Sequence, residues 1–165
     1  PMPKARLEAG KADIELQKAA RNGNIKLMGR LLAKGARVNA QDVDGWTSLH
    51  AAAAEGHLGA IQHLCARDDV DVNIETNDGR TALYLASLDG NEDCVRELLR
   101  TGADAHVLNS DGKGAHDVAV LFDRTNVIPA LEEALKSPPP PRKPERSKSN
   151  PAIDEGLKMK ADSYI

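Results

Sequence analysis

The sequence contains five histidines, two cysteines and several clustered acids, which are the residue types that most often catalyse reactions or bind metals. Their spacing fits neither role. His57 and His63 are six residues apart, which is poor spacing for sharing a metal on one helix face, and the acids at 68–71 lack the pattern of a calcium loop. The sequence has no H-E-x-x-H motif, no glycine-rich phosphate loop and no nucleophile motif. We therefore expect no enzymatic activity, no cofactor and no metal site.

The cysteines and the overall charge narrow the class of protein further. Cys65 and Cys94 lie within apolar runs, which predicts buried, reduced thiols and hence an intracellular protein. We find no secretory signal and no apolar run of membrane-spanning length. The formal net charge of −3 argues against a basic surface for nucleic acid. We expect a soluble protein, cytoplasmic or also nuclear, that binds neither nucleic acid nor membrane and is a monomer alone.

A serine near the end of the chain carries the most specific chemical signal. Arg146, Ser149 and Pro151 fit an R-S-x-S-x-P pattern, which resembles the ligands of 14-3-3 proteins. Phosphorylation of Ser149 would add about two negative charges and three acceptor oxygens for an arginine cluster. The arginine three positions upstream also suits many serine/threonine kinases. The same residues fit a solvated linker, so both interpretations stay open.

Two further patterns near the C-terminus could bind protein modules. Pro138, Pro141 and Lys143 fit P-x-x-P-x-K/R, a polyproline pattern that docks on SH3 domains, with a stiff spacer as the alternative. The last three residues, 163–165, resemble a PDZ ligand, provided that the chain naturally ends there. A short amphipathic turn at 153–165 that folds back on the rest of the chain is a further alternative.

The elements that must position any binding residue come from an internal repeat of about 33 residues. Three sets of landmarks recur together at this period: Gly23, Gly56 and Gly90; Ala19, Ala52 and Ala86; and Leu16, Leu49 and Leu83. Because three independent landmarks share one period, the sequence predicts stacked copies of one structural unit.

Each unit is predicted to contain two short helices joined by a tight turn. In the central units the expected helices span about residues 48–55, 58–66, 82–89 and 92–100. Thr47 and Thr81 stand where the first helix needs a hydroxyl N-cap. Gly56 and Gly90 stand where a left-handed residue must turn the chain into the second helix.

Two stretches then resemble the T-P-L-H-x-A signature of ankyrin repeats, namely TSLHAA at 47–52 and TALYLA at 81–86. The resemblance covers about residues 11–136. It implies an all-α ankyrin-repeat solenoid of helix-turn-helix units with projecting turn fingers. In this family the signature histidine ties neighbouring loops together, so Tyr84 is expected to lose that contact.

The repeats are expected at 11–43, 44–77, 78–110 and 111–136, following an N-terminal extension at 1–10 and preceding a disordered Pro/Ser/Lys-rich tail at 137–165. The outer two repeats are expected to act as caps. The first helix is expected to start near Asp13. In the last repeat Asp123 replaces the turn glycine, and Pro129 is expected inside the second helix. The turn after the second repeat carries one extra residue, and Asp68 or Asp69 is expected to make it in a left-handed conformation.

The resemblance also implies that partners bind along the finger tips and the concave face of the first helices. The candidates at the tips are Asp44, Trp46, Asp78, Arg80, Asp111 and Lys113. The candidates at the helix ends are Ala54, Glu55, Leu88, Asp89, Leu121 and Phe122. Trp46 is expected to face solvent and act as a binding hot spot, with packing on a neighbouring turn as the alternative. The apolar helix ends are expected to form a ridge, unless Phe122 packs into the cap.

The function that follows is a non-enzymatic adaptor or scaffold whose repeats bind one protein and whose tail binds another. The alternative is a regulatory or targeting subunit of an enzyme such as a phosphatase or kinase. The stretches at 44–53 and 114–136 look somewhat like the ankyrin region of myosin-phosphatase targeting subunits. The sequence lacks the R/K-V/I-x-F/W motif expected of phosphatase-1 binders.

Overall fold

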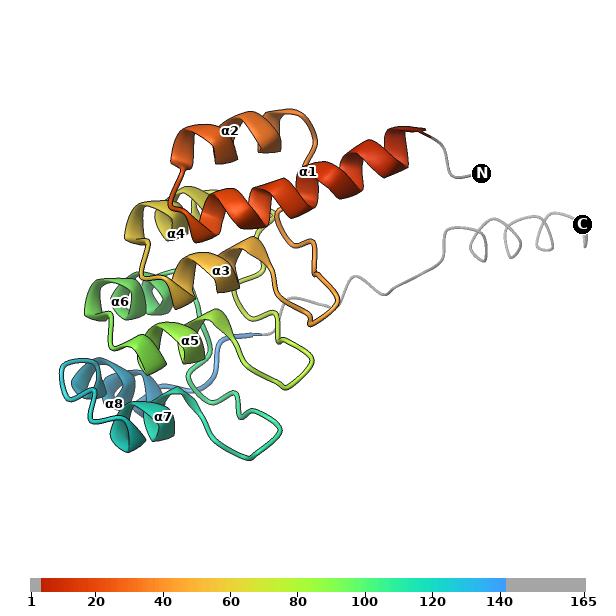
Figure 1. The fold of residues 1–165 in the computed structure, drawn as a ribbon. Coiled ribbons are helices and arrows are strands. Elements are labelled where there is room, and N and C mark those ends of the chain that lie inside the picture. Colours follow the sequence, from red (N-terminus) through yellow and green to blue (C-terminus); the bar gives the residue numbers. More distant parts are fainter. Residues whose placement is uncertain (1–3, 142–165) are drawn as a thin grey trace, which may run out of the picture.

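The structure is a computed structural model that describes residues 4–141, with side chains from residue 10 onward. This part of the chain folds into α-helices and loops and contains no strand (Figure 1). The helices are α1 (Lys4–Arg21), α2 (Ile25–Ala33), α3 (Ser48–Ala54), α4 (Leu58–Cys65), α5 (Ala82–Asp89), α6 (Glu92–Arg100), α7 (Ala115–Leu121) and α8 (Ile128–Lys136). The predicted all-α class is confirmed.

The helices stack as successive pairs. The inner helices α1, α3, α5 and α7 pack on one another in a row, and α2, α4, α6 and α8 form an outer row beside them (Figure 1). The loops between pairs project to one side as the first finger (residues 36–47), the second finger (70–81) and the third finger (103–114). This arrangement is the helical solenoid that the repeat predicted.

The inner helices of the central pairs are short and rich in small residues because they are packed on several sides. Residues 48–53 and 82–87 are all buried. Thr47 Oγ1 accepts a hydrogen bond from the backbone N–H of His50 (3.4 Å), and Thr81 accepts the equivalent bond in α5 (3.3 Å). The predicted N-caps are confirmed, and they pair N–H groups that a buried helix start would otherwise leave unmatched.

Left-handed residues join the two helices of a pair, as predicted. Gly56 and Gly90 have φ values of +69° and +79°. In the last pair Asp123 takes this position with φ of 54°, and it is the one non-glycine residue with positive φ among those described. Aspartate tolerates this conformation better than most residues, which explains how the cap keeps the turn without glycine.

The turn after α4 is built differently from our expectation. Neither Asp68 nor Asp69 has a positive φ, so the predicted left-handed aspartate was wrong. Arg67 Nε instead binds the Asp69 carboxylate at 2.8 Å, and the Asp69 carbonyl accepts a hydrogen bond from Asn39 Nδ2 at 2.7 Å. Side-chain contacts, and not a left-handed residue, therefore hold the turn that contains the extra residue.

Both ends of the stack also differ from the prediction. α1 begins at Lys4, well before Asp13, and so runs through residues that we expected to form an extension. Asp13 is buried, where its carboxylate accepts hydrogen bonds from the backbone N–H (2.7 Å) and Nη2 (2.6 Å) of Arg37. Asp13 thus ties α1 to the first finger instead of starting a helix.

Pro129 lies in the first turn of α8, not in its interior. Backbone N–H groups in the first turn have no partner within the helix, so the missing N–H of proline costs no helical hydrogen bond there.

Candidate protein-binding surface

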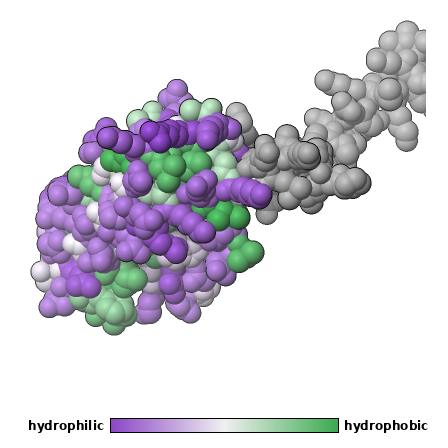
Figure 2. Space-filling view, turned by 45° about the horizontal axis from the view of Figure 1, so that its top comes forward, coloured by the Kyte–Doolittle hydropathy of each residue, from purple (hydrophilic) through white to green (hydrophobic). Residues whose placement is uncertain are grey.

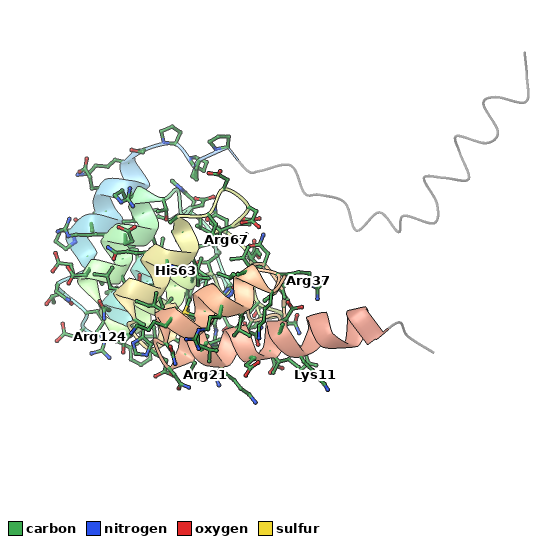
Figure 3. All side chains as sticks on the ribbon, turned by 90° about the horizontal axis from the view of Figure 1, so that it is seen from above. Lys11, Arg21, Arg37, His63, Arg67 and Arg124 are labelled. Carbon is green, nitrogen blue, oxygen red and sulfur yellow. The ribbon has the colours of Figure 1, made fainter. Side chains whose placement is uncertain are left out.

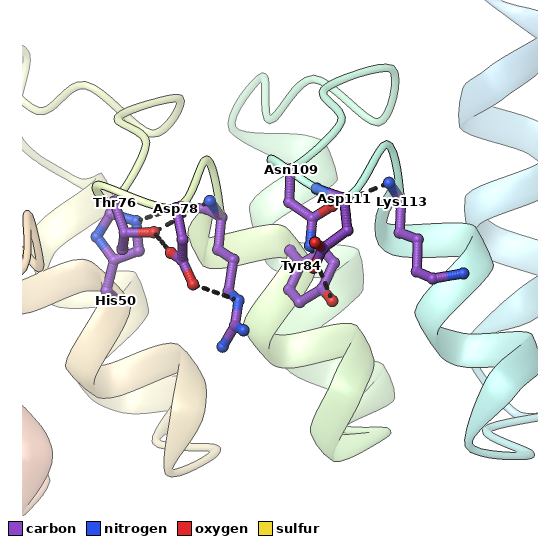
Figure 4. Close-up of polar contacts among 8 residues, drawn as sticks. His50, Thr76, Asp78, Tyr84, Asn109, Asp111 and Lys113 are labelled. Carbon is purple, nitrogen blue, oxygen red and sulfur yellow. Dashed lines mark hydrogen bonds and ion pairs between the residues drawn. The ribbon is translucent and has the colours of Figure 1, made fainter.

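One oxygen-bearing side chain closes a turn in each finger. It accepts a hydrogen bond from the backbone N–H four residues later, as Figure 4 shows for the second and third fingers. The acceptor and donor pairs are Asp42 and Trp46 (2.8 Å), Thr76 and Arg80 (3.0 Å), and Asn109 and Lys113 (2.9 Å). Our sequence reasoning missed these acceptors, although an oxygen-bearing residue four positions before the variable one occurs in every finger.

Successive fingers are hydrogen-bonded to each other through their backbones. The N–H of Asn77 donates to the carbonyl of Asp44 at 3.0 Å, and the N–H of Ser110 donates to the carbonyl of Asp78 at 2.9 Å. The Asn77 side chain adds a bond to the carbonyl of Val43 at 2.8 Å. The predicted tip residues therefore belong to one connected row of loops, which we call the finger ladder.

Trp46 is half-buried and packs against the core, so it is not the solvent-facing side chain that we expected. The centroid of its ring lies 6.1 Å from the centroid of the His50 ring. The guanidinium carbon of Arg21 lies over the Trp46 ring, 6.0 Å from its centroid. Gln17 of α1 donates a hydrogen bond to its carbonyl at 2.6 Å. Trp46 thus joins the first finger to α1, with part of its surface still open to a partner.

Arg80 occupies the same position in the second finger and is also half-buried. Its guanidinium lies 5.7 Å from the ring centroid of Tyr84, and its Nε lies 2.9 Å from the Asp78 carboxylate (Figure 4). These two contacts hold the arginine in one orientation. Lys113, at the equivalent position in the third finger, is exposed.

The signature position of α5 keeps its link to the next finger, contrary to our expectation. In α3, His50 Nε2 lies 3.1 Å from the carbonyl of Arg80. In α5, the hydroxyl of Tyr84 accepts a hydrogen bond from Nδ2 of Asn109 at 3.4 Å. Tyrosine therefore replaces the histidine contact with a longer one to a different group of the neighbouring finger.

His50 is held in its neutral form. Its Nδ1 accepts a hydrogen bond from the N–H of Thr47 at 3.1 Å, which leaves Nε2 to donate to the Arg80 carbonyl. A proton on Nδ1 would face the Thr47 N–H. Burial lowers the pKa of His50 from its ordinary value of 6.5, against a smaller opposite effect of the carbonyls of Arg80 and Ile74.

Acidification is expected to destabilise the fold through His50. Because the pKa is lower in the folded state than in the unfolded state, the unfolded chain binds more protons between the two values. The free energy of unfolding then falls by up to about 1.4 kcal/mol per pH unit as the pH drops below the ordinary pKa. Urea unfolding above and below pH 6.5 measures this slope. A His50→Gln variant should show a flatter slope, and an unchanged slope would contradict the assignment.

The predicted residues at the helix ends have very different environments. Ala54 and Leu88 are half-buried and pack against the core, whereas Glu55 and Asp89 are exposed. In the last repeat, 64% of Leu121 and 51% of Phe122 are exposed. Phe122 therefore does not pack fully into the cap, and the apolar ridge is concentrated at the α7 end of the row.

A groove of about 500 Å³ lies between the outer helices α6 and α8. Its lining includes Leu99, Ala103 and Ala134, together with Pro138 and Pro140. Of the predicted SH3 pattern, Pro138 and Pro141 are described and exposed. The other tail residues that we predicted as ligands lie outside the described residues: Lys143, Arg146, Ser149, Pro151 and the terminal 163–165.

Within the described side chains, no group of three or more His, Cys, Asp or Glu residues could hold a metal ion. Cys94 is buried as predicted, whereas Cys65 is only half-buried, so that part of the prediction was wrong. Burial raises the pKa of the Cys94 thiol to about 11 and also raises the pKa of Cys65. Because the thiolate is the reactive form, neither cysteine is activated as a nucleophile. None of the helices described is both long and apolar enough to cross a membrane.

The comparisons with known proteins agree with this architecture. The family description "Ankyrin repeats (3 copies)" matches residues 16–109, which is more than half of the chain. The repeats of this family bind other proteins.

Three curated relatives show the extent of the similarity. The chain is 38% identical over 88 residues to human Ankyrin repeat and SOCS box protein 3, which covers 52% of this chain and 17% of that protein. It is 38% identical over 103 residues to human Neurogenic locus notch homolog protein 2, covering 62% of this chain and 4% of that protein. It is 36% identical over 100 residues to Probable E3 ubiquitin-protein ligase XBOS31 of Oryza sativa subsp. japonica, covering 59% of this chain and 22% of that protein. The chain thus spans less than a quarter of each relative. On the period, the fold and the family match together, it belongs to the ankyrin-repeat family.

Proposed function

We propose that this chain is a non-enzymatic cytoplasmic adaptor that binds a partner protein along the finger ladder and the adjoining ends of the inner helices. The observation that carries the proposal is the row of Trp46, Arg80 and Lys113 on fingers whose backbones are hydrogen-bonded to one another. Such a row is pre-organised, so little ordering entropy is lost when a partner binds. The free thiols of the half-buried Cys65 and the buried Cys94 fit a reducing compartment.

The proposed surface combines three kinds of contact. Trp46 and Arg80 belong to the residue types that dominate binding energies at protein interfaces. Asp44, Asp78 and Asp111 stand along the finger tips, and Glu55 and Asp89 stand at the helix ends. These acids favour a partner with basic residues, mainly through the rate of encounter. Leu121 and Phe122 would supply an apolar contact at one end of the row.

A double substitution, Trp46→Ala with Arg80→Ala, tests this surface. Affinity purification from cells with quantitative mass spectrometry should show the principal partner reduced by about tenfold or more. Arg96→Ala, on the outer helix α6, is the matched control and should retain the partner. Because Trp46 is half-buried, a second pair, Glu55→Lys with Asp89→Lys, changes exposed residues of the same surface. Full retention of the partner by both double variants would place the binding site elsewhere.

The tail is proposed to recruit a second protein, and phosphorylated Ser149 is the preferred ligand because its arginine and proline neighbours match a 14-3-3 pattern. SH3 binding through Pro138, Pro141 and Lys143, and PDZ binding through 163–165, are weaker proposals of the same kind. Recovery of 14-3-3 proteins should depend on Ser149 and fall to background in Ser149→Ala. Equal recovery with Ser149→Ala would exclude this switch.

A regulatory or targeting subunit of a phosphatase or kinase would use the same finger surface. The identity of the captured partner separates the two proposals. A targeting subunit must bind an enzyme, whereas an adaptor joins two non-catalytic or unrelated proteins. Two of the relatives carry SOCS box or ubiquitin ligase names, but the similarity covers a small part of each. Co-purification of a catalytic subunit that is lost in the finger variants would support the targeting role.

A further inference from the structure

The charges of this chain are separated along the stack. Residues 1–43 contain nine Lys and Arg against four Asp and Glu, a net charge of +5. Residues 44–136 contain seven Lys and Arg against seventeen Asp and Glu, a net charge of −10. The first helix pair and its finger are therefore basic, and the rest of the solenoid is acidic.

The cations of the first pair stand where another repeat would pack. In the second pair the positions that face the preceding pair hold uncharged or small residues: Ser48 and Ala51 are buried, and Gly59 and His63 lie against Ile25 and Gly29 of α2. In the first pair the residues 33 positions earlier are Glu15, Lys18, Lys26 and Arg30. Together with Lys11 and Ile14 of α1, these residues form what we call the basic end of the stack. Figure 3 looks onto this end, with α1 and α2 nearest the viewer.

The basic end has few internal partners. Among the described side chains, none of Lys11, Lys18, Lys26 and Arg30 forms an ion pair. Ile14 is 55% exposed. In Figure 2, where this end is turned forward, hydrophilic residues cover most of it, with smaller hydrophobic areas between them. A terminal repeat must be polar to stay hydrated, but this requirement does not explain why four cations gather there against one acid, Glu15.

The other end of the stack has the opposite character. Val120 of α7 is 54% exposed, whereas its counterpart Ser87 in α5 is fully buried between repeats. Beside Val120 lies a hollow of about 460 Å³ whose lining includes Asp111, Asp117 and one cation, Lys113. Glu132 of α8 lies 3.8 Å from Nε2 of His116, which also lines the hollow, and Leu135 of the same helix is exposed. We call this surface the acidic end.

We propose that the basic end of one molecule binds the acidic end of a second copy, so that the chain self-associates head to tail. Ile14 would pack beside Val120, and Lys11, Lys18, Lys26 and Arg30 would face Asp111, Asp117 and Glu132. Inner helices already pack on inner helices at every junction within the chain, and α1 on α7 of the next copy would continue that row. The sequence expectation of a monomer would then hold only for dilute protein.

Charge favours this occupant over the other anionic surfaces that attract lysine. An anionic membrane or a nucleic acid would attract residues 1–43 but repel the net charge of −10 that follows. A second copy brings its acidic end to the basic end without that conflict. Because the two surfaces differ, the contact is heterologous, and each molecule added leaves a new end free. Association should therefore proceed beyond a dimer.

Sedimentation equilibrium of the full chain tests the proposal directly. At low salt the weight-average mass should rise with concentration to more than about twice the monomer mass at roughly millimolar protein. The rise should disappear at about 1 M NaCl, where exposed charges are screened beyond about 3 Å. A constant monomer mass across this range, or a rise that salt does not reduce, would overturn the proposal.

Charge exchange between the two ends identifies the surfaces. Lys18→Glu with Arg30→Glu should abolish association, and so should Asp111→Lys with Glu132→Lys. A mixture of these two variants should associate again, because the reversed basic end of one matches the reversed acidic end of the other. Arg96→Glu with Arg100→Glu, a charge reversal of the same size on α6, is the control and should associate like the parent chain. Failure of the mixture to associate would overturn the proposed pairing of ends.

A membrane role for the basic end is a distinct outcome. Flotation with vesicles of phosphatidylserine and phosphatidylcholine measures it on the same protein. Binding to these vesicles by a chain that stays monomeric, lost in Lys18→Glu with Arg30→Glu, would replace self-association by membrane attachment. The proposal expects self-association and no vesicle binding above that of neutral vesicles.

Discussion

Substituting Gly45 by alanine is expected to lower the free energy of unfolding by about 2–4 kcal/mol. Gly45 has φ of +83°, and an alanine Cβ there would lie 2.7 Å from the backbone N of Asn77 and 3.0 Å from the Cα of Thr76. Left-handed strain accounts for about 1–2 kcal/mol, and displacement of the second finger accounts for the rest. Urea unfolding followed by circular dichroism measures the loss.

Gly112 provides the matched control for Gly45. It occupies the same position in the third finger with φ of +71°, but a Cβ there would meet nothing within 4 Å. Gly112→Ala should therefore show only the left-handed strain of about 1–2 kcal/mol. The difference between the two variants is the contribution of contact between fingers. Equal losses would mean that this contact adds nothing to stability.

Leu83→Ala is expected to destabilise the chain by about 2–5 kcal/mol, because Leu83 is fully buried in α5 between α3 and α7. A solenoid is held together by contacts between neighbouring repeats. The cavity should therefore loosen both junctions of the third pair and divide unfolding into two steps. Hydrogen exchange should then show α1–α4 protected longer than α5–α8.

Leu88, later in the same helix, is the control for Leu83. It is half-buried, so Leu88→Ala removes less packing and should cost less than about 1.5 kcal/mol with unfolding still in one step. A loss below 1 kcal/mol for Leu83→Ala, or a single cooperative transition for it, would contradict the nearest-neighbour description of this stack.

The parts of the fold that the sequence predicted well depend on neighbours along the chain. Thr47 and Thr81 cap their helices by accepting hydrogen bonds from backbone N–H groups three residues later. Gly56 and Gly90 turn the chain by their own conformation. A period of about 33 residues repeats these local signals, so the pairs of α3 to α6 matched the expected ranges closely.

The errors arose where distant residues decide the outcome. Burial of Trp46 depends on Arg21, Gln17 and His50, two of which belong to the preceding helix pair. The turn after α4 depends on Asn39 of the preceding finger. No short window of sequence contains both partners of such contacts. The same limit applies to the proposed binding surface, because the repeat predicted that its residues form one row but did not show how their side chains are held.

The opposite charges of residues 1–43 and residues 44–136 also give the molecule a permanent electric dipole. The charges of +5 and −10 are centred on repeats whose helices stack about 8–10 Å apart, so the dipole lies along the row of helices. A dipolar molecule turns its positive end toward a negative surface even when its net charge is negative. At low ionic strength this protein should therefore be retained by cation-exchange as well as anion-exchange resins at neutral pH. Its isoelectric point near 6.0 alone would predict retention on the anion exchanger only.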